Sequence, residues 1–311
     1  MELISSIFTL STAQTAMELG CIYALVALAL FLSFSILNIA DLSTDGCFTL
    51  GCAVCCQVTL LGHPILGLVA AMVAGVLSGY ITALLQTKLG VASILAGIIV
   101  NTGLYTVNLA VMGFSSTLSV FKCDTIFSMT KDLLEPVLGG WYKLVVAAVI
   151  VLVMGALLTW FLKTRLGLSI RATGDSPDMI KASSVNPAFT ITVGLCISGS
   201  LTALSGAVLA QYQKSCDINL GTGMVTIALA SLIIGETLVG KGGMFRRVLG
   251  AILGSCLYRL FVAVALRLNV PAECMKLVSA LIVAIAIASP AMKHFVEFQK
   301  QKLGRKGGVS C

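Results

Sequence analysis

The chain has 311 residues, of which 58% are hydrophobic and only 11% are charged, against roughly 25% charged residues in ordinary soluble domains. Its mean hydropathy is +1.03. This composition excludes a soluble protein and predicts an all-α, polytopic transmembrane bundle that forms a single domain over residues 1–311. The net charge of +7 indicates membrane topology and not nucleic-acid binding, because basic residues beside spans mark the cytoplasmic side.

Nine apolar spans are predicted in chain order, and residues 1–15 are expected to form either a short interfacial segment or a tenth span. Residues 1–15 also lack the basic region and the cleavage site of a signal peptide. The nine spans are 16–37, 47–61, 65–85, 91–113, 141–162, 189–212, 224–239, 248–266 and 270–289.

Two of these spans, 47–61 and 224–239, are short for a full crossing. Each follows a longer span and a polar hinge, which contains Asp41 in the first case and Asp217 in the second. Such a hinge indicates a broken helix, which is tolerated at membrane depth only where it lines a cavity. Because the two copies run in opposite directions in the predicted topology, they suggest an inverted repeat.

The longest polar interruption is the segment 163–187. Within it, the run Ser176-Pro177-Asp178 is typical of a helix start, with a hydroxyl cap, a proline at the first helical position and an acid in the first turn. Asn186-Pro187 is expected to end this short helix. A capped helix held between two spans suits contact with a cytoplasmic partner better than it suits catalysis.

The distribution of lysine and arginine predicts the orientation. If the segment 163–187 is cytoplasmic, the inside loops and the tail hold about twice as many basic residues as the outside loops. This count places the segment 163–187 and the basic tail 291–311 in the cytoplasm.

Several polar residues lie inside the predicted spans, where they usually face a bundle interior or a pathway. Asn101 and Asn108 share one side of the span 91–113 with Thr102 and Tyr105. For the two asparagines, lining a translocation path and hydrogen bonding between helices are equally favoured.

Three acidic residues have structural interpretations. Asp41 and Asp45 are expected to cap the short helix that follows them, with a place on the translocation path as the alternative. Glu236 is expected to form an ion pair with Lys241 or with an arginine.

Two motifs match the sequence patterns of known chemical sites only in part. Residues 235–241 match most of a phosphate-binding loop, but glycine stands at position 242, where a metal-binding hydroxyl is needed, and the motif ends an apolar span. Cys52, Cys55 and Cys56 lie in an apolar stretch and are expected to fill a helix. Since no catalytic constellation is found, neither an enzyme activity nor a metal or cofactor is predicted.

Several stretches resemble the permeases of ABC importers for branched-chain amino acids and sugars, and two of them, ADLSTDG and IIGE, are closest to the branch associated with tryptophan or tyrosine uptake. The matching stretches are GCIYALVAL (20–28), NIADLSTDG (38–46), RATGDSPDM (171–179) and ASLIIGE (230–236). The resemblance implies that the segment 163–187, here named the coupling segment, docks on an ATP-hydrolysing subunit. Ser184 stands where that family usually has glycine, so the coupling helix is expected to end differently.

The resemblance implies a permease of the bacterial cytoplasmic membrane that imports a small solute, with an aromatic or branched-chain amino acid as the expected cargo. The implied partners are ATP-binding subunits, an external substrate-binding lipoprotein and a second, identical permease chain. Coupling is assigned to Gly174, Asp175, Ser176, Pro177, Asp178, Met179, Lys181 and Ala182, and the translocation path to Asp41, Asp45, Asn101 and Asn108. The alternative is an ion-coupled secondary transporter that uses Glu18 or Glu236 and needs no ATPase.

Overall fold

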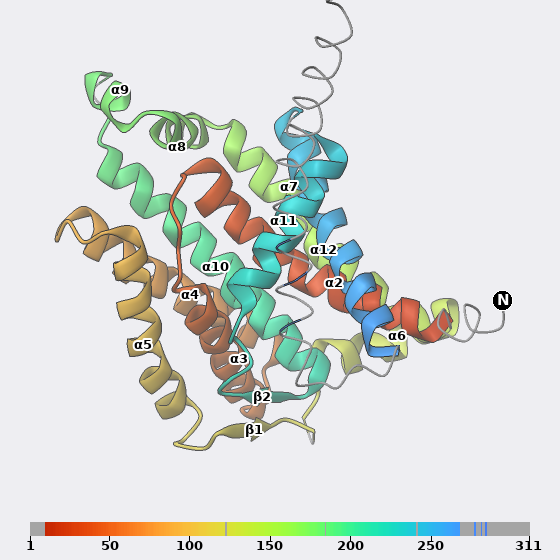
Figure 1. Ribbon diagram of the computed structural model, residues 1–311. Coiled ribbons are helices and arrows are strands. Elements are labelled where there is room, and N and C mark those ends of the chain that lie inside the picture. Colours follow the sequence, from red (N-terminus) through yellow and green to blue (C-terminus); the bar gives the residue numbers. More distant parts are fainter. Residues whose placement is uncertain are drawn as a thin grey trace, which may run out of the picture.

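The computed structural model describes residues 10–267 apart from 122, 184 and 241, together with residues 277, 281 and 284. The predicted tail 291–311 and, but for those three residues, the predicted span 270–289 lie outside this description. Most of the described chain is helical (Figure 1), which confirms an all-α polytopic bundle. Within the described part, six helices are long and apolar enough to cross a membrane, namely Ser11–Ile36, Pro64–Thr87, Ser93–Val111, Gly139–Lys163, Pro187–Gln213 and Met244–Leu266.

The first helix of the bundle changes from an α-helix to a π-helix along its length. α2 (Leu10–Leu30) continues directly into the π-helix η1 (Phe31–Ile36). The expectation of a separate interfacial segment is therefore wrong for residues 10–15, because they belong to the same helix as the first span. After η1 the chain turns back into the bundle, and α3 (Thr44–Leu60) starts near its middle (Figure 1).

The remaining elements follow with short connections. After α3 come α4 (Pro64–Thr87), α5 (Ser93–Val111), β1 (Thr117–Ser119), α6 (Ile126–Leu138), η2 (Gly139–Trp141) and α7 (Tyr142–Lys163). The second half comprises α8 (Arg165–Asp175), α9 (Pro177–Ala182), α10 (Pro187–Gln213), β2 (Ser215–Asp217), α11 (Met224–Val239) and α12 (Met244–Arg267). β1 and β2 form an antiparallel pair in which Leu118 lies opposite Cys216.

Two central helices, α2 and α10, are buried along most of their length, whereas only about a third or less of the residues of α4, α5 and α7 are buried. Small residues allow the close crossings. Where α4 meets α10, a Cβ atom on Gly75 or on Gly199 would overlap the backbone of the other helix. Contacts of this kind replace the hydrophobic effect in helix association within lipid, because close backbone approach maximises van der Waals packing.

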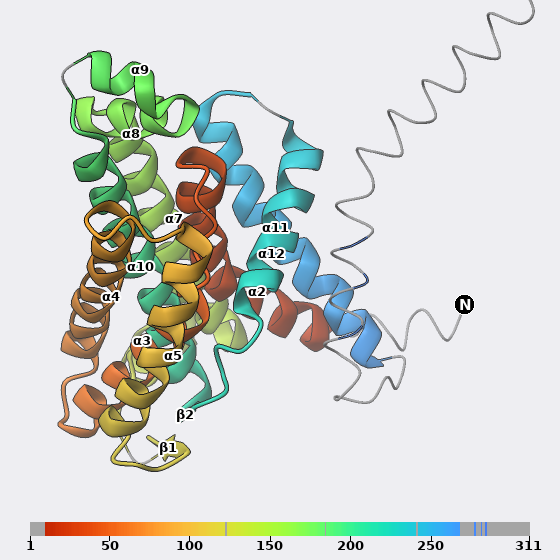
Figure 2. The same ribbon diagram turned by 60° about the vertical axis from the view of Figure 1, so that its left-hand side comes forward.

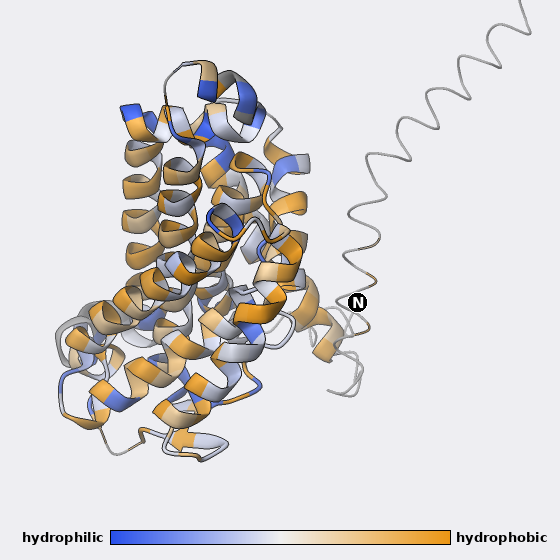
Figure 3. Ribbon diagram, turned by 90° about the vertical axis from the view of Figure 1, so that its left-hand side faces the viewer, coloured by the Kyte–Doolittle hydropathy of each residue, from blue (hydrophilic) through white to orange (hydrophobic). Residues whose placement is uncertain are grey.

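The connections that the sequence assigns to the inside lie toward one end of the bundle (Figure 2). This end carries α8 and α9, the α4–α5 connection and the α11–α12 connection. β1, β2 and the α3–α4 connection lie toward the opposite end. Hydrophilic residues gather on α8 and α9, while the helices below them are predominantly hydrophobic (Figure 3). The grouping of the loops agrees with the predicted alternation of spans.

Candidate functional site

The coupling segment folds into two helices and not into the single short helix that the sequence predicts. α9 starts at Pro177, as expected, and ends at Ala182. The additional helix is α8, where Thr164 Oγ1 accepts a hydrogen bond from the backbone N–H of Gly167 at 3.3 Å. α8 packs one face on the bundle through Ile170 and Thr173, which are both buried. The coupling segment is therefore a two-helix surface across one end of the bundle.

The end of the coupling segment is also built differently from the prediction. Asn186 accepts a hydrogen bond from the backbone N–H of Ala188 at 3.0 Å and thereby caps α10, which begins at Pro187. α9 has already ended at Ala182. The expectation for Ser184 lies outside the described residues.

α8 is fixed to two other elements by close contacts. A Cβ atom on Gly174 would overlap the carbonyl oxygen of Ile36, the last residue of η1. One residue earlier, the hydroxyl groups of Thr173 and Thr190 lie 2.8 Å apart and connect α8 to α10. Any displacement of α8 therefore acts directly on η1 and on α10.

The outer surface of the coupling segment carries four of the eight predicted coupling residues, namely Asp175, Asp178, Lys181 and Ala182. Lys181 donates a hydrogen bond to Asp178 at 3.2 Å, and their side chains are 62% and 92% exposed. Asp175 and Ala182 are also exposed, whereas Gly174 and Ser176 are partly buried. Pro177 and Met179 belong to the same helix, α9.

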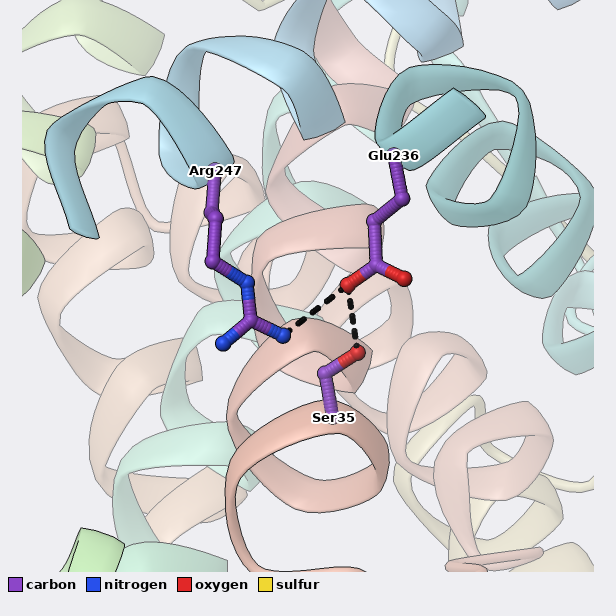
Figure 4. Close-up of polar contacts among 3 residues, drawn as sticks. All are labelled: Ser35, Glu236 and Arg247. Carbon is purple, nitrogen blue, oxygen red and sulfur yellow. Dashed lines mark hydrogen bonds and ion pairs between the residues drawn. The ribbon is translucent and has the colours of Figure 1, made fainter. Parts of the chain in front are cut away.

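η1 is also held by an ion pair between α11 and α12 (Figure 4). Arg247 Nη2 donates to Glu236 Oε1 at 3.0 Å, and Ser35 Oγ donates to the same oxygen at 2.9 Å. The Arg247 guanidinium also stands over the Phe31 ring, 5.1 Å from its centroid. The prediction that Glu236 pairs with an arginine is confirmed, while Lys241 lies outside the described residues.

Glu18, the other acidic residue considered for ion coupling, connects α2 to α10. Its carboxylate accepts hydrogen bonds from Gln14 Nε2 at 2.9 Å and from the Tyr212 hydroxyl at 2.8 Å. Both carboxylates that the secondary-transporter hypothesis relies on are thus engaged by protein donors.

Asp41 and Asp45 do not cap the helix that follows them. Asp41 accepts hydrogen bonds from the backbone N–H and the hydroxyl of Ser43, at 2.9 and 2.6 Å, and so closes the turn before α3. Asp45 instead accepts from the backbone N–H groups of Gly223 and Val225, both at 2.9 Å, at the start of α11. The capping expectation is wrong for Asp45, because its carboxylate caps a helix far away in the sequence.

The contact through Asp45 brings the first turns of α3 and α11 together. A second bond supports it, since Thr49 Oγ1 accepts from the backbone N–H of Gly221 at 3.1 Å. From this meeting point α3 and α11 run toward opposite ends of the bundle (Figures 1 and 2).

We expect Asp45→Ala to lower the stability of the folded protein by about 2 kcal/mol, because the start of α11 loses two charge-assisted hydrogen bonds. Thermal unfolding in detergent measures this change. Asp217→Ala is the matched control, since Asp217 is also partly buried but, within the described part of the chain, accepts one backbone N–H, from Asn219 at 2.8 Å. Equal losses for the two variants would contradict a special role of Asp45.

A polar cavity of about 290 Å³ lies beside this junction. Its walls come from α3, α5 and the loop between β2 and α11, and the residues are Asp45, Gly46, Thr49, Asn101, Thr102, Tyr105, Asn108, Ile218, Asn219 and Thr222. The structure therefore brings together three of the four predicted path residues, and the fourth, Asp41, is not among those lining the cavity.

Gly46 is what allows the two asparagines to approach α3. A Cβ atom at Gly46 would lie 2.7 Å from Asn101 Oδ1, closer than side chains tolerate, and the Gly46 carbonyl oxygen accepts a hydrogen bond from Asn108 Nδ2 at 3.1 Å. Sequence reasoning missed Thr49, Asn219 and Thr222. Of these three, only Thr49 could have been identified from the sequence, because it follows Asp45 by one helical turn and therefore lies on the same face of the helix.

Comparisons with known proteins agree with this architecture. The family model described as the branched-chain amino acid transport system permease component matches residues 13–287. A tyrosine transport system permease protein of Clostridioides difficile is 30% identical over 276 residues, covering 88% of this chain and 90% of that protein. The D-allose transport system permease protein of Escherichia coli is 28% identical, over 80% of this chain and 72% of that protein. The autoinducer 2 import system permease protein of Salmonella typhimurium is 29% identical, over 70% and 57%.

Proposed function

The chain belongs to the family of branched-chain amino acid transport permeases, and from this premise we propose that two copies of it form the translocation path for an amino acid. As a member of that family it is the membrane-spanning permease of an ABC importer for a small solute, in the bacterial inner membrane. It is not an enzyme, because ATP hydrolysis takes place on separate subunits. An amino acid as cargo is supported by the tyrosine permease relative.

The observation that carries this proposal is the anchoring of the coupling segment. α8 and α9 expose charged residues to a partner, while Gly174 and Thr173 fix α8 to η1 and α10. When ATP binding closes the subunits below, the displacement of α8 is passed to α10 and, through η1, to α2, and both of these helices are buried along most of their length. A rigid-body rearrangement of this kind shifts a two-state equilibrium between outward and inward openings.

The meeting of α3 and α11 supports an inverted repeat. Both are short apolar helices, they start beside one another at Asp45, and they run to opposite ends. Transporters built from such repeats hold their cargo where the discontinuous helices meet. On this proposal Asp45, Asn101 and Asn108 line the translocation path, with the coupling segment on the cytoplasmic side.

The decisive experiment is purification of the chain from its native membrane in a gentle detergent, followed by identification of the proteins that accompany it. We expect an ATP-binding subunit and an external binding protein, and the ligand of that binding protein identifies the cargo. A stable complex that contains neither partner would contradict the proposal and would favour ion-driven transport.

We expect the double variant Asp178→Ala, Lys181→Ala to lose most of its association with the ATP-binding subunit. Because both side chains are largely exposed, their removal should change folding stability by no more than about 0.5 kcal/mol. Co-purification measures the association. The control is Lys131→Ala, Glu135→Ala, which removes another exposed ion pair, in α6. If the first variant still co-purifies with the ATP-binding subunit, the assignment of coupling to Asp178 and Lys181 is wrong.

A further inference from the structure

The cavity beside Asp45 has the chemistry of a binding site for one class of solute. Resting on the proposed function, we propose that it binds a neutral or zwitterionic solute and not an anion. A hydroxyl or amino group of the solute donates a hydrogen bond to Asn108 Oδ1, and the Tyr105 ring covers the non-polar part of the solute. Asn108 and Tyr105 are thereby specificity-determining residues of the permease itself.

Asn108 supplies an unused acceptor. Its side chain is only 1% exposed, its Nδ2 group already donates to the Gly46 carbonyl, and its buried Oδ1 atom has no hydrogen-bond partner among the residues that the structure describes. An unpaired buried acceptor is destabilising, because it has lost its hydrogen bonds to water without gaining others. A solute that donates to this oxygen replaces the lost hydrogen bond, so the site selects for hydroxyl and amino groups.

The described lining of the cavity carries one negative charge. Asp45 is the only charged residue among the described residues that line it, and its two oxygens already accept backbone N–H groups from Gly223 and Val225. The partial positive charge at the start of α11 offsets the carboxylate only in part, so the cavity stays negative. Among the described lining residues no side chain is cationic, so an anionic solute would be repelled by the carboxylate.

The rest of the wall offers hydrogen bonds and one aromatic ring. Amide and hydroxyl groups surround the cavity, on Thr49, Asn101, Thr102, Asn219 and Thr222. Tyr105 is 51% exposed and lies one helical turn before Asn108, so much of its surface remains free to cover a solute. At about 290 Å³, the cavity is at the lower end of ligand pockets and suits one small metabolite.

Thiol labelling tests the cavity without requiring transport. The Tyr105→Cys variant is treated with a cationic and with an anionic methanethiosulfonate, and Ser116→Cys is the control, because Ser116 is exposed in the loop between α5 and β1 and does not line the cavity. We expect the cationic reagent to react at least about tenfold faster at the first position only. We also expect L-tyrosine or D-allose, but not L-glutamate, to slow that reaction. Equal rates with both reagents and no protection by either solute would overturn the proposal.

Uptake by the reconstituted importer provides the second test. Asn108→Leu and Tyr105→Ala should raise the KM for the imported solute at least about tenfold. Gln57→Leu is the matched control, because the Gln57 amide also donates to a carbonyl of another helix, that of Val111 at 2.7 Å, but lies outside the cavity. If Asn108→Leu does not fold, Tyr105→Ala still tests the proposal. Tyr105 is half exposed, so its truncation should leave the fold intact.

Failure of the cavity proposal and failure of the proposed function give different experimental results. Import by the wild type with an unchanged KM in both variants overturns the cavity proposal and leaves the proposed function intact. Absence of any import by the wild type, together with solute protection of the Tyr105→Cys thiol, supports the cavity and contradicts the proposed function.

Discussion

Gly174→Ala should lower solute uptake about tenfold, although it adds only one methyl group. That methyl group would overlap the carbonyl oxygen of Ile36, so α8 must move away from η1. Overpacking of this kind costs typically 1 to 3 kcal/mol, and a loss of 1.4 kcal/mol in the coupling equilibrium corresponds to a factor of ten. Uptake and solute-stimulated ATP hydrolysis are measured together in proteoliposomes, at equal permease content.

The matched control for this prediction is Gly103→Ala. Gly103 is also a helical glycine, but a Cβ atom there meets open space, and alanine raises helix propensity equally at both positions. We expect wild-type uptake for Gly103→Ala and a larger loss for Gly174→Val than for Gly174→Ala. If Gly174→Ala transports at the wild-type rate, α8 does not transmit its movement through η1.

Breaking the ion pair of Glu236 and Arg247 should give the largest loss of stability. We expect Glu236→Gln and Arg247→Met each to cost about 2 to 4 kcal/mol, because each leaves its partner charge uncompensated. The two side chains are only 21% and 24% exposed, so water screens the remaining charge weakly. Unfolding in detergent measures the loss.

A double-mutant cycle separates the ion pair from general disruption. The double variant should lose at least about 1 kcal/mol less than the sum of the single variants, because the two charges disappear together. The exposed pair of Asp178 and Lys181 is the reference, with an expected coupling below about 0.5 kcal/mol. Strictly additive losses at Glu236 and Arg247 would show that their contact contributes nothing to stability.

The translocation-path candidates on α5 were predictable from the sequence because they depend on helical spacing. Asn101 and Asn108 are separated by two helical turns, and spacing alone places them on one side with Tyr105. The structure shows all three lining one cavity. Local periodicity determines which residues share a face, and a polar face in an apolar helix already indicates a buried polar environment.

The role of Asp45 was not predictable, because its partners depend on the packing of the two halves of the chain. An acid in the first turn of a helix has the local signature of a cap for that helix, but the Asp45 carboxylate reaches Gly223 and Val225 instead. Similarly, the sequence predicted Lys241 or an arginine as the partner of Glu236 without saying which arginine, and the packing of α12 on η1 places Arg247 beside it.

α8 was missed for a related reason. The sequence shows a polar stretch, and a polar stretch between two spans is first interpreted as a loop. Whether it forms a helix depends on burial of one face, here through Ile170 and Gly167, against the end of the bundle. That surface exists only after α7 and α10 have packed.

The contact between α3 and α11 also has a consequence for biosynthesis. Asp45 precedes its hydrogen-bond partners by 178 and 180 residues. At a synthesis rate of about 5 to 20 residues per second, the carboxylate is made roughly 10 to 35 s before α11 leaves the ribosome. An unpaired carboxylate is costly in hydrocarbon, so during this interval the start of α3 must stay hydrated or be shielded by the insertion machinery. The centre of the bundle is therefore completed only late in translation.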